Sequence, residues 1–193
     1  MSYVALADLK VELGYAEDDE TYDALLQQKL DEATAFIERH TEKRFGVDTD
    51  TTRYFDAVAD VDGRSLWLGT WCAGITSIVN GDGVAVTGNQ YTTYPRNETS
   101  FFSVRLKGSS GVSWTYADDP EDAIAVTGKW GYTTDVPDDV AAACTLIATH
   151  LFRRRENSGG DLDRTVVVAG ATLLPAALPR EAMDLLRYYV PRI

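Results

Sequence analysis

The residues that could do chemistry are few and scattered. His40 and His150 each fall on a predicted helix, without an HExxH pattern or a second histidine nearby, so a core or surface role is expected for both rather than metal binding. Cys72 and Cys144 lie far apart, outside any CxxC or Cys/His cluster, and are predicted to be small buried apolar residues. The sequence therefore predicts no catalytic site, no metal site and no cofactor, which favours a protein that is not an enzyme.

Three short motifs have a structural interpretation that is stronger than the chemical one. Residues 108–111, GSSG, lack the GxSxG spacing of a nucleophile elbow and indicate a turn. Asp60, Asp62 and Gly63 resemble the start of a calcium loop, but Leu66, Trp67 and Leu68 stand where later ligands are needed. An acidic run could collect a cation, although a solvated turn is the expected structure: Asp118, Asp119, Glu121 and Asp122. No GxGxxG or GxxxxGK[ST] phosphate loop occurs.

Charge and composition narrow the possible partners. The 193 residues are 45% hydrophobic, enough for a buried core, and their formal net charge is -12. This charge argues against a protein that wraps DNA by neutralising phosphates, but an acidic wall could line a conduit through which DNA slides. The chain shows no apolar run of about 18 residues and no signal-peptide pattern, so a reducing cytoplasm and no membrane are expected.

Two helices are predicted before residue 45. In residues 7–14 and the preceding Leu6, leucines recur on one face and Gly14 stands where helices end. The acidic residues 17–20 then complement the N-terminal end of a second helix, predicted over about residues 20–41.

From Phe45 the helical spacing gives way to short β-rich runs, which predict a β-rich module. The runs are TTRYFDA, RSLWLG, ITSIVN, VAVTG, QYTTYP, FFSVRL, VSWTYA and AIAVTGKWGY. Residues 80–83, NGDG, predict a hairpin turn between ITSIV and VAV, and Asp62-Gly63 predicts another turn.

A third helix is predicted over residues 137–156, because Pro137 and the following aspartates suit a first helical turn. Its apolar face is expected to pack on the second helix. Residues 157–161 indicate a flexible linker, TVVVAGATLLPAALP an extended arm, and residues 179–189 a last helix.

This order predicts an α+β fold in which N- and C-terminal helices form a small bundle with a β-rich insertion between them. The predicted divisions are residues 1–46 with 136–160 for the bundle, 47–135 for the insertion, and 161–193 for an extended C-terminal arm ending in a helix.

Two sets of side chains are candidates for contact with a partner. Arg153, Arg154 and Arg155 suit a helix C-terminus, where cations complement the dipole, and could alternatively dock an acidic partner or phosphate. The terminal helix offers residue types found both at core edges and at interfaces. The candidate docking set is Arg153, Arg154, Arg155, Leu185, Leu186, Tyr188, Tyr189 and Arg192.

The four tryptophans support a different function. Trp67, Trp71, Trp114 and Trp130 could stack on a sugar or a peptide in a β-rich ligand-binding module, although tryptophans in such a module more often fill the core.

Four segments in this order resemble the head-tail connector (adaptor, or head completion) proteins of tailed bacteriophages. They are VALADLKVELGY, DALLQQKLDEATAFIERHTEKRF, ITSIVNGDG with its later YP, and VTGKWGYTTDVPDDVAAACTLIATHLFRRRE, which contains the pattern W-G-Y-x-x-x-V-P-D-D. Together, in this order, these segments cover both ends of the core.

The resemblance implies a structural subunit in the neck of a virion, assembled in the cytoplasm of a host bacterium. It implies a homo-oligomeric ring, dodecameric in the family, that binds the portal of the DNA-filled head and a tail-side stopper or tail terminator protein. DNA would pass through the ring without sequence-specific binding. The candidate docking set would then meet the portal, because the C-terminal segment of such proteins tends to reach toward it. The β-rich insertion is larger than in the shortest relatives and could face the stopper or neighbouring subunits.

Overall fold

The computed structural model describes residues 2–157, 166–168, 171–173 and 178–191. The chain divides into two compact units: a helical unit, Met1–Lys43 with Val136–Ile193, and a β unit, Arg44–Asp135. Both ends of the chain therefore belong to the same unit. Within the described residues, the helices are all too short or too polar to cross a membrane.

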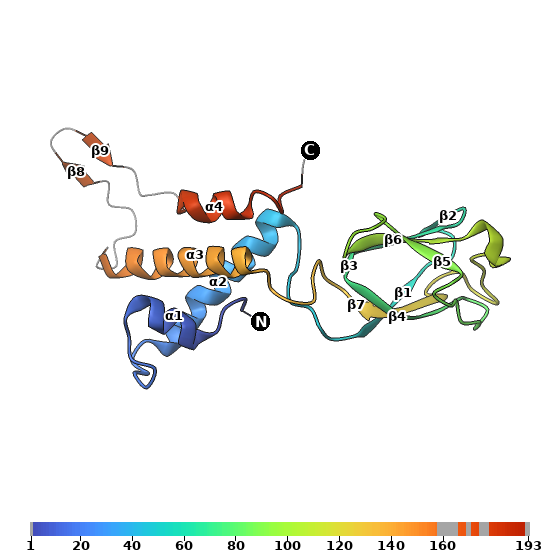
Figure 1. The fold of residues 1–193 in the computed structure, drawn as a ribbon, viewed down its shortest axis with the longest axis horizontal. Coiled ribbons are helices and arrows are strands. Elements are labelled where there is room, and N and C mark those ends of the chain that lie inside the picture. Colours follow the sequence, from blue (N-terminus) through green and yellow to red (C-terminus); the bar gives the residue numbers. More distant parts are fainter. Residues whose placement is uncertain (1, 158–165, 169–170, 174–177, 192–193) are drawn as a thin grey trace. The chain divides into compact units, whose positions relative to one another are not determined.

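The helical unit begins with α1 (Leu6–Leu13) and α2 (Asp23–Thr41) (Figure 1). Gly14 ends α1 with φ 80°, a left-handed conformation that glycine adopts without steric cost, which confirms the predicted stop. α2 begins at Asp23, three residues later than predicted, because the preceding acidic residues form a turn. In that turn the Asp19 carboxylate accepts a hydrogen bond from the Thr21 amide at 3.0 Å.

α3 (Asp138–Asn157) packs on α2, as predicted from its apolar face. At this contact the hydroxyl of Thr34 lies 3.7 Å from the thiol of Cys144. The two helices contribute most of the buried apolar side chains of the unit, among them Leu26, Leu30, Ala33, Ile37, Val140, Ala143, Cys144, Ile147, Ala148 and Phe152. The α+β fold with N- and C-terminal helices packed together is therefore confirmed.

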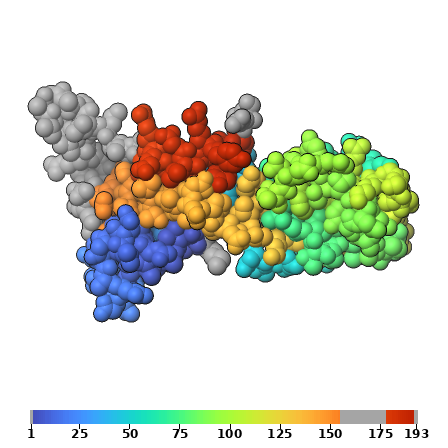
Figure 2. All heavy atoms as spheres, in the orientation of Figure 1, coloured from blue at the N-terminus to red at the C-terminus, as the bar shows by residue number. Residues whose placement is uncertain are grey.

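α4 (Arg180–Leu186) lies along α3, and their side chains are in contact (Figures 1 and 2). The predicted last helix is shorter than expected, because residues 187–189 form a turn after Leu186. In the predicted arm, β8 (Val166–Val168) pairs with β9 (Ala171–Leu173) in an antiparallel hairpin. The rest of the arm and most of the predicted linker lie outside the described residues.

The β unit contains two antiparallel sheets. The first has the order β1-β7-β4, from β1 (Thr51–Phe55), β7 (Ile124–Lys129) and β4 (Gly74–Val79). The second has the order β2-β3-β6-β5, from β2 (Val61–Asp62), β3 (Ser65–Cys72), β6 (Phe101–Leu106) and β5 (Tyr91–Tyr94). The turn at Asp62-Gly63 joins β2 to β3, as predicted.

Two of the predicted β-rich runs are not strands. Residues 84–88 contribute one bridge, Val79 to Ala85, and residues 112–117 contribute one, Gly81 to Tyr116. The NGDG turn forms, with the Asn80 amide donating to the Val84 carbonyl at 2.9 Å, but the main partner of β4 is β7. In place of a strand ladder, the side chain of buried Asn80 holds residues 113–115. It donates to the Ser113 carbonyl and accepts from the Thr115 amide.

One apolar core fills the β unit between the sheets. Its buried members come from both sheets and from the loops that join them: Phe55, Ala57, Leu66, Leu68, Cys72, Ile78, Val86, Phe101, Val104, Leu106, Ile124, Val126 and Trp130. Cys72 and Cys144 are both free and fully buried, as predicted, and burial raises the pKa of each thiol.

Candidate interaction surfaces

The polar side chains considered for chemistry do not come together in the structure. His40 stacks on Phe36 with ring centroids 5.6 Å apart, and the buried Nε2 of His150 has no hydrogen-bond partner among the described residues. Asp60 accepts a hydrogen bond from the Asp56 amide in a local turn, and Ser110 caps a 3-10 turn by donating to the Lys107 carbonyl. The part of the chain that the structure describes holds no group of three or more His, Cys, Asp or Glu side chains able to bind a metal.

The candidate docking set divides between buried and exposed positions. Leu186 is fully buried and Tyr189 is 8% exposed, whereas Tyr188 is 78% exposed. Leu185 and Arg154 are half-buried and Arg153 is exposed. The side chain of Arg155 and the whole of Arg192 lie outside the described residues.

The buried members hold α4 in the helical unit. The Tyr189 hydroxyl donates to the Asp139 carboxylate at 2.9 Å, which connects the turn after α4 to the first turn of α3. The Lys43 ammonium lies 5.9 Å from the centre of the Tyr189 ring. Tyr188, the preceding residue, is directed to solvent and is accessible to a partner.

The four tryptophans of the β unit are divided between its interior and its surface. Trp130 is buried in the core and donates from Nε1 to the Thr51 carbonyl at 2.7 Å. Trp114 packs against the core and donates to the Arg64 carbonyl at 2.9 Å. Trp67 is 46% exposed and Trp71 is half-buried. Trp114 is half-buried as well, so the stacking function proposed for all four excludes only Trp130 and could involve Trp67, Trp71 and Trp114.

Trp67 and Trp71 belong to a continuous group of rings, here called the aromatic face. Phe102 is its centre, with ring centroids 5.8 Å from Trp67, 5.2 Å from Trp71 and 5.6 Å from Tyr94. Trp71 also lies 5.2 Å from Tyr132, which extends the group to five rings. Such ring pairs stabilise one another beyond the area that they bury, so the group is held in place as a unit.

Strand register explains why Trp67 and Tyr94 of the aromatic face are on the outside of their sheet. Leu66 pairs with Val104, and both are fully buried against the core. The next pair, Trp67 with Ser103, must point to the opposite side, because successive side chains on a strand alternate between faces. Tyr94 pairs with the same Ser103 and is 57% exposed. A small serine thus lies between two large rings that are half open to solvent.

A polar row lies beside the rings on the same side of the sheet. Register joins Asp62, Ser65, Arg105 and Thr92 across all four strands. Arg105, at the centre of the row, is exposed, and Arg96 is also exposed two residues after Tyr94. Neither arginine has a hydrogen-bond or ion-pair partner among the described residues. The surface therefore combines aromatic rings with unpaired cations.

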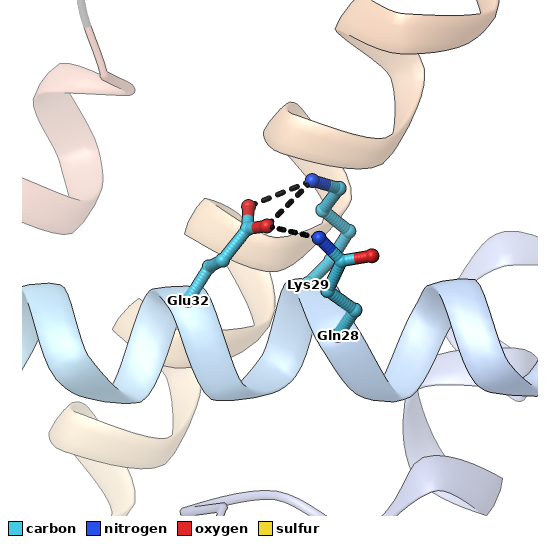
Figure 3. A network of polar contacts seen from close by, with 3 residues as sticks. All are labelled: Gln28, Lys29 and Glu32. Atoms are coloured by element: carbon cyan, nitrogen blue, oxygen red, sulfur yellow. Dashed lines mark hydrogen bonds and ion pairs between the residues drawn. The ribbon is translucent and has the colours of Figure 1, made fainter.

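The first loop of the helical unit and α2 carry several acidic side chains, some of which contact lysines. Lys10 is buried and holds the loop by donating to the Glu17 carbonyl at 3.0 Å and pairing with Asp23 at 2.6 Å. On α2, Lys29 and Gln28 both donate to the Glu32 carboxylate, at distances from 2.7 to 2.9 Å (Figure 3). These contacts order polar side chains but contain no arrangement for chemistry.

The aromatic face was only partly visible in the sequence. The tryptophans drew attention as a residue type, but Tyr94, Phe102 and Tyr132 join them through strand pairing and a loop. The sequence did offer one signal: the β-rich runs FFSVRL and QYTTYP contain aromatic residues, as does the run that contains Trp67 and Trp71. Lys10 was missed altogether, because a lysine on a short helix is normally exposed.

Comparison with known proteins gives a likeness of fold. No protein-family model matches the chain, and no curated protein matches it in sequence. A chain in the neck of an empty gene transfer agent (GTA) particle, computed with C6 symmetry, is 19% identical with a TM-score of 0.59; the match covers 99% of this chain and 91% of that one. A chain in the virion of a native GTA particle gives 19% identity, the same coverages and a TM-score of 0.57.

A chain in the neck of a native GTA particle, computed with C12 symmetry, matches in the same way. It is 19% identical, covers 100% of this chain and 96% of that one, and has a TM-score of 0.54. Because each match spans nearly the whole of both chains, it includes the helical unit and the β unit together. The chain therefore has the fold of these GTA neck and virion chains.

Proposed function

We propose that this chain is a non-enzymatic structural subunit of the neck of a phage or phage-like particle. The observation that carries the proposal is the fold likeness along the entire chain to neck chains of GTA particles. The sequence resemblance to head-tail connector proteins supports the same function from independent features. Fold alone does not determine function, so the site chemistry matters too, and the described residues offer interfaces rather than a catalytic constellation.

In this function the chain forms a ring, dodecameric as in the connector family. A cyclic ring is built from head-to-tail contacts, so each subunit needs two different complementary surfaces. The chain offers surfaces of contrasting chemistry: the aromatic face with unpaired arginines, and acidic loops in both units. The helical unit would form the body of the ring, and the β-rich insertion would extend toward neighbours or a stopper protein.

The ring would continue the DNA channel between the portal and the tail. A formal charge of -12 suits a channel wall, because like charges repel the phosphate backbone and prevent adhesion. Sequence-specific contacts with DNA are not expected from such a surface. The place of action would be the neck of the virion, with assembly in the host cytoplasm.

The proposed portal contact is the exposed part of the candidate docking set. Tyr188 and Arg153 are exposed, and Leu185 is half-buried on the same short helix that precedes Tyr188. Tyrosine and arginine are enriched among residues that dominate binding energy at interfaces. Leu186 and Tyr189 would act indirectly, by holding α4 against α3.

Native mass spectrometry of this chain with the portal protein encoded by the same genome tests the function. The expected result is a portal ring carrying many copies of the chain. An intact portal ring that carries none would contradict the proposal.

Point variants test the docking site more sharply than removal of residues 165–193, because that deletion would also remove buried Ala182 and Leu186. Tyr188→Ala combined with Arg153→Glu is expected to weaken portal binding at least tenfold. Val11→Ala is a matched control, since Val11 is 72% exposed and lies outside the docking set. Unchanged portal binding by the double variant would place the portal contact elsewhere.

Ligand binding by the β unit is the second candidate function. The exposure of Trp67 beside Tyr94 favours it, because sugars stack on open aromatic rings. A glycan array and quenching of tryptophan fluorescence by the bound saccharide test this function directly.

A further inference from the structure

We propose that a second copy of this chain covers the aromatic face, with the acidic turn at residues 118–122 of that copy lying against Arg96 and Arg105. This inference rests on the proposed function, since it assigns the two surfaces that join neighbouring subunits in the ring. The proposed contact joins the β units of two copies and is separate from the portal contact at the C-terminal end.

The composition of the aromatic face matches the centre of a protein interface. Aromatic residues and arginine are enriched at interface centres, whereas lysine and acidic residues are depleted. Five rings in contact form the surface here, and Trp67 and Tyr94 remain 46% and 57% exposed. Their mutual packing fixes the rings before any partner binds, so little conformational entropy is lost on association.

The charges of the chain indicate that the partner covering the aromatic face is a second copy. Arg96 and Arg105 have no ion-pair partner among the described residues, in a chain whose net charge is -12. The complement lies in the same unit: a turn with four exposed carboxylates, also without ion-pair partners in the described part of the chain, formed by Asp118, Asp119, Glu121 and Asp122. Opposite charges on two surfaces of one chain favour copies that associate head to tail.

The acidic turn is held in a defined shape, as an interface requires. The Pro120 carbonyl accepts a hydrogen bond from the Ala57 amide at 2.8 Å, which attaches the turn to the loop after β1. The neighbouring Ala117 amide donates to the Gly81 carbonyl at 3.1 Å. The carboxylates are thus presented from an anchored backbone, and their exposure leaves them available to the arginines of another copy.

A charge exchange tests the contact in the full chain assembled on the portal ring and in the chain alone. Arg105→Glu and Asp119→Arg are each expected to weaken the association between copies about tenfold or more, measured by analytical ultracentrifugation and native mass spectrometry. The double variant is expected to recover most of the loss, because the two exchanged charges then attract one another across the contact between copies. Arg39→Glu, an equal change of charge at an exposed position of α2, is the matched control.

The aromatic contribution has its own pair of variants. Trp67→Ala is expected to weaken the association about tenfold, whereas Tyr54→Ala, which removes a ring that is 61% exposed on the other sheet, should leave it unchanged. Tryptophan fluorescence of each variant during urea unfolding shows whether the β unit still folds.

Mixing the single variants tests the head-to-tail direction. Arg105→Glu retains an unaltered acidic turn and Asp119→Arg retains an unaltered aromatic face, so unlike copies can form the original contact. Association should be recovered in the mixture, whereas each variant alone should associate weakly. Full association by both single variants would overturn the inference.

The outcomes separate this inference from the proposed function. Portal rings that carry many copies, with no dependence on Arg105 or Asp119, would overturn the contact and leave the neck function standing. Absence of portal binding combined with charge-dependent self-association would overturn the neck function and support the contact. A monomer that binds no portal would overturn both. Binding of a saccharide to Trp67 in assembled copies would also overturn the contact, because the aromatic face would then be open.

Discussion

The two units of the chain treat their large apolar side chains differently. In the helical unit the exposed ones lie in different segments: Val11 is on α1, Tyr22 precedes α2 and packs on buried Phe152, and Tyr188 is in the turn after α4 and packs on buried Tyr189. The buried ones form a core between helices. In the β unit, exposed Trp67 and Tyr94 belong to one continuous group of rings. Single exposed apolar side chains are common on protein surfaces, but a contiguous patch marks an interaction site. The β unit therefore has a continuous aromatic surface, on which the proposed contact between copies is based, whereas the portal contact proposed for the helical unit depends on separate exposed side chains.

The units also differ in how closely their backbone segments approach one another. α2 and α3 pack through side chains that vary in size, whereas β7 approaches its neighbours so closely that only glycine fits at one position. A Cβ on Gly128 would meet the Gly74 carbonyl oxygen and lie 3.4 Å from the Cys72 sulfur. All four tryptophans lie in the β unit, so their fluorescence reports on its unfolding, while circular dichroism at 222 nm reports mainly on the helices.

The largest expected effect is in the helical core. Phe152 is 1% exposed and its ring contacts Tyr15 and Tyr22 edge to face, with centroids 6.2 and 5.8 Å away. Phe152→Ala should lower the free energy of unfolding by about 4 kcal/mol, through lost burial and the cavity left behind. Urea unfolding followed at 222 nm measures the loss. Val11→Ala, at an exposed site, should change it by less than about 0.5 kcal/mol. Equal effects of the two variants would contradict the assignment of Phe152 to the core.

Gly128→Ala tests the close approach in the β unit. We expect a loss of about 2 to 3 kcal/mol, because the added methyl group pushes β4 away from β7. The tryptophan fluorescence transition in urea measures it. Gly88→Ala is the matched control, since no atom lies within 4 Å of its added Cβ. A fluorescence midpoint shared by Gly128→Ala and the unsubstituted chain would show that the strands can separate without cost.

Lys10→Met and Lys29→Met compare a more buried ion pair with a less buried one. The Lys10 side chain is 5% exposed, and its removal leaves Asp23 and the Glu17 carbonyl without their donor. The expected loss is about 2 kcal/mol, less than for a fully buried pair, because Asp23 keeps 31% exposure. Lys29→Met removes the pair with Glu32 shown in Figure 3 and should cost about 0.5 kcal/mol. The difference between the two unfolding free energies is the test.

The smallest expected effect concerns the two thiols, one in each unit. Burial raises the pKa of Cys72 and Cys144, so both stay protonated and slow to react with a thiol reagent at pH 8 until urea unfolds the chain. Their contribution to stability is fully present below the pKa of the unfolded thiols, about 8.5, and is lost as pH rises toward the raised folded values. Rates of modification with Cys72→Ser and Cys144→Ser assign each site. Fast modification of either thiol in the folded chain would contradict its burial.

Local patterns in the sequence were enough to predict most of the elements. The leucine spacing before Gly14, the Pro137-Asp138-Asp139 start and the Asp62-Gly63 turn each appear in the structure within a few residues of the expected place. These features depend on helix termini, turn chemistry and periodicity, which act over a few neighbouring residues. The packing of α3 on α2 was also predictable, because each helix has one apolar face that needs a partner.

Pairing over long distances was not predictable from the same patterns. VAVTG and VSWTYA have β-rich sequences, yet only single bridges form there: Val79 to Ala85 on the free edge of β4, and Gly81 to Tyr116. Asn80 holds residues 113–115 through its side chain. α4 ended earlier than its apolar spacing indicated. β propensity describes a residue that fits a pleated surface, and which strand it meets is decided by the rest of the sheet.

By itself, the sequence determined the α+β class, the helix boundaries to within a few residues, the burial of both cysteines and the scarcity of catalytic residue patterns. The tertiary structure alone decided which apolar and aromatic residues were buried together and which were exposed together. It divided the four tryptophans between core and surface, directed Tyr188 outward and Tyr189 inward, and brought Tyr94, Phe102 and Tyr132 to the rings of β3. The physical reason is that a side chain's face is set by strand register and helix contact, which join residues far apart in the chain.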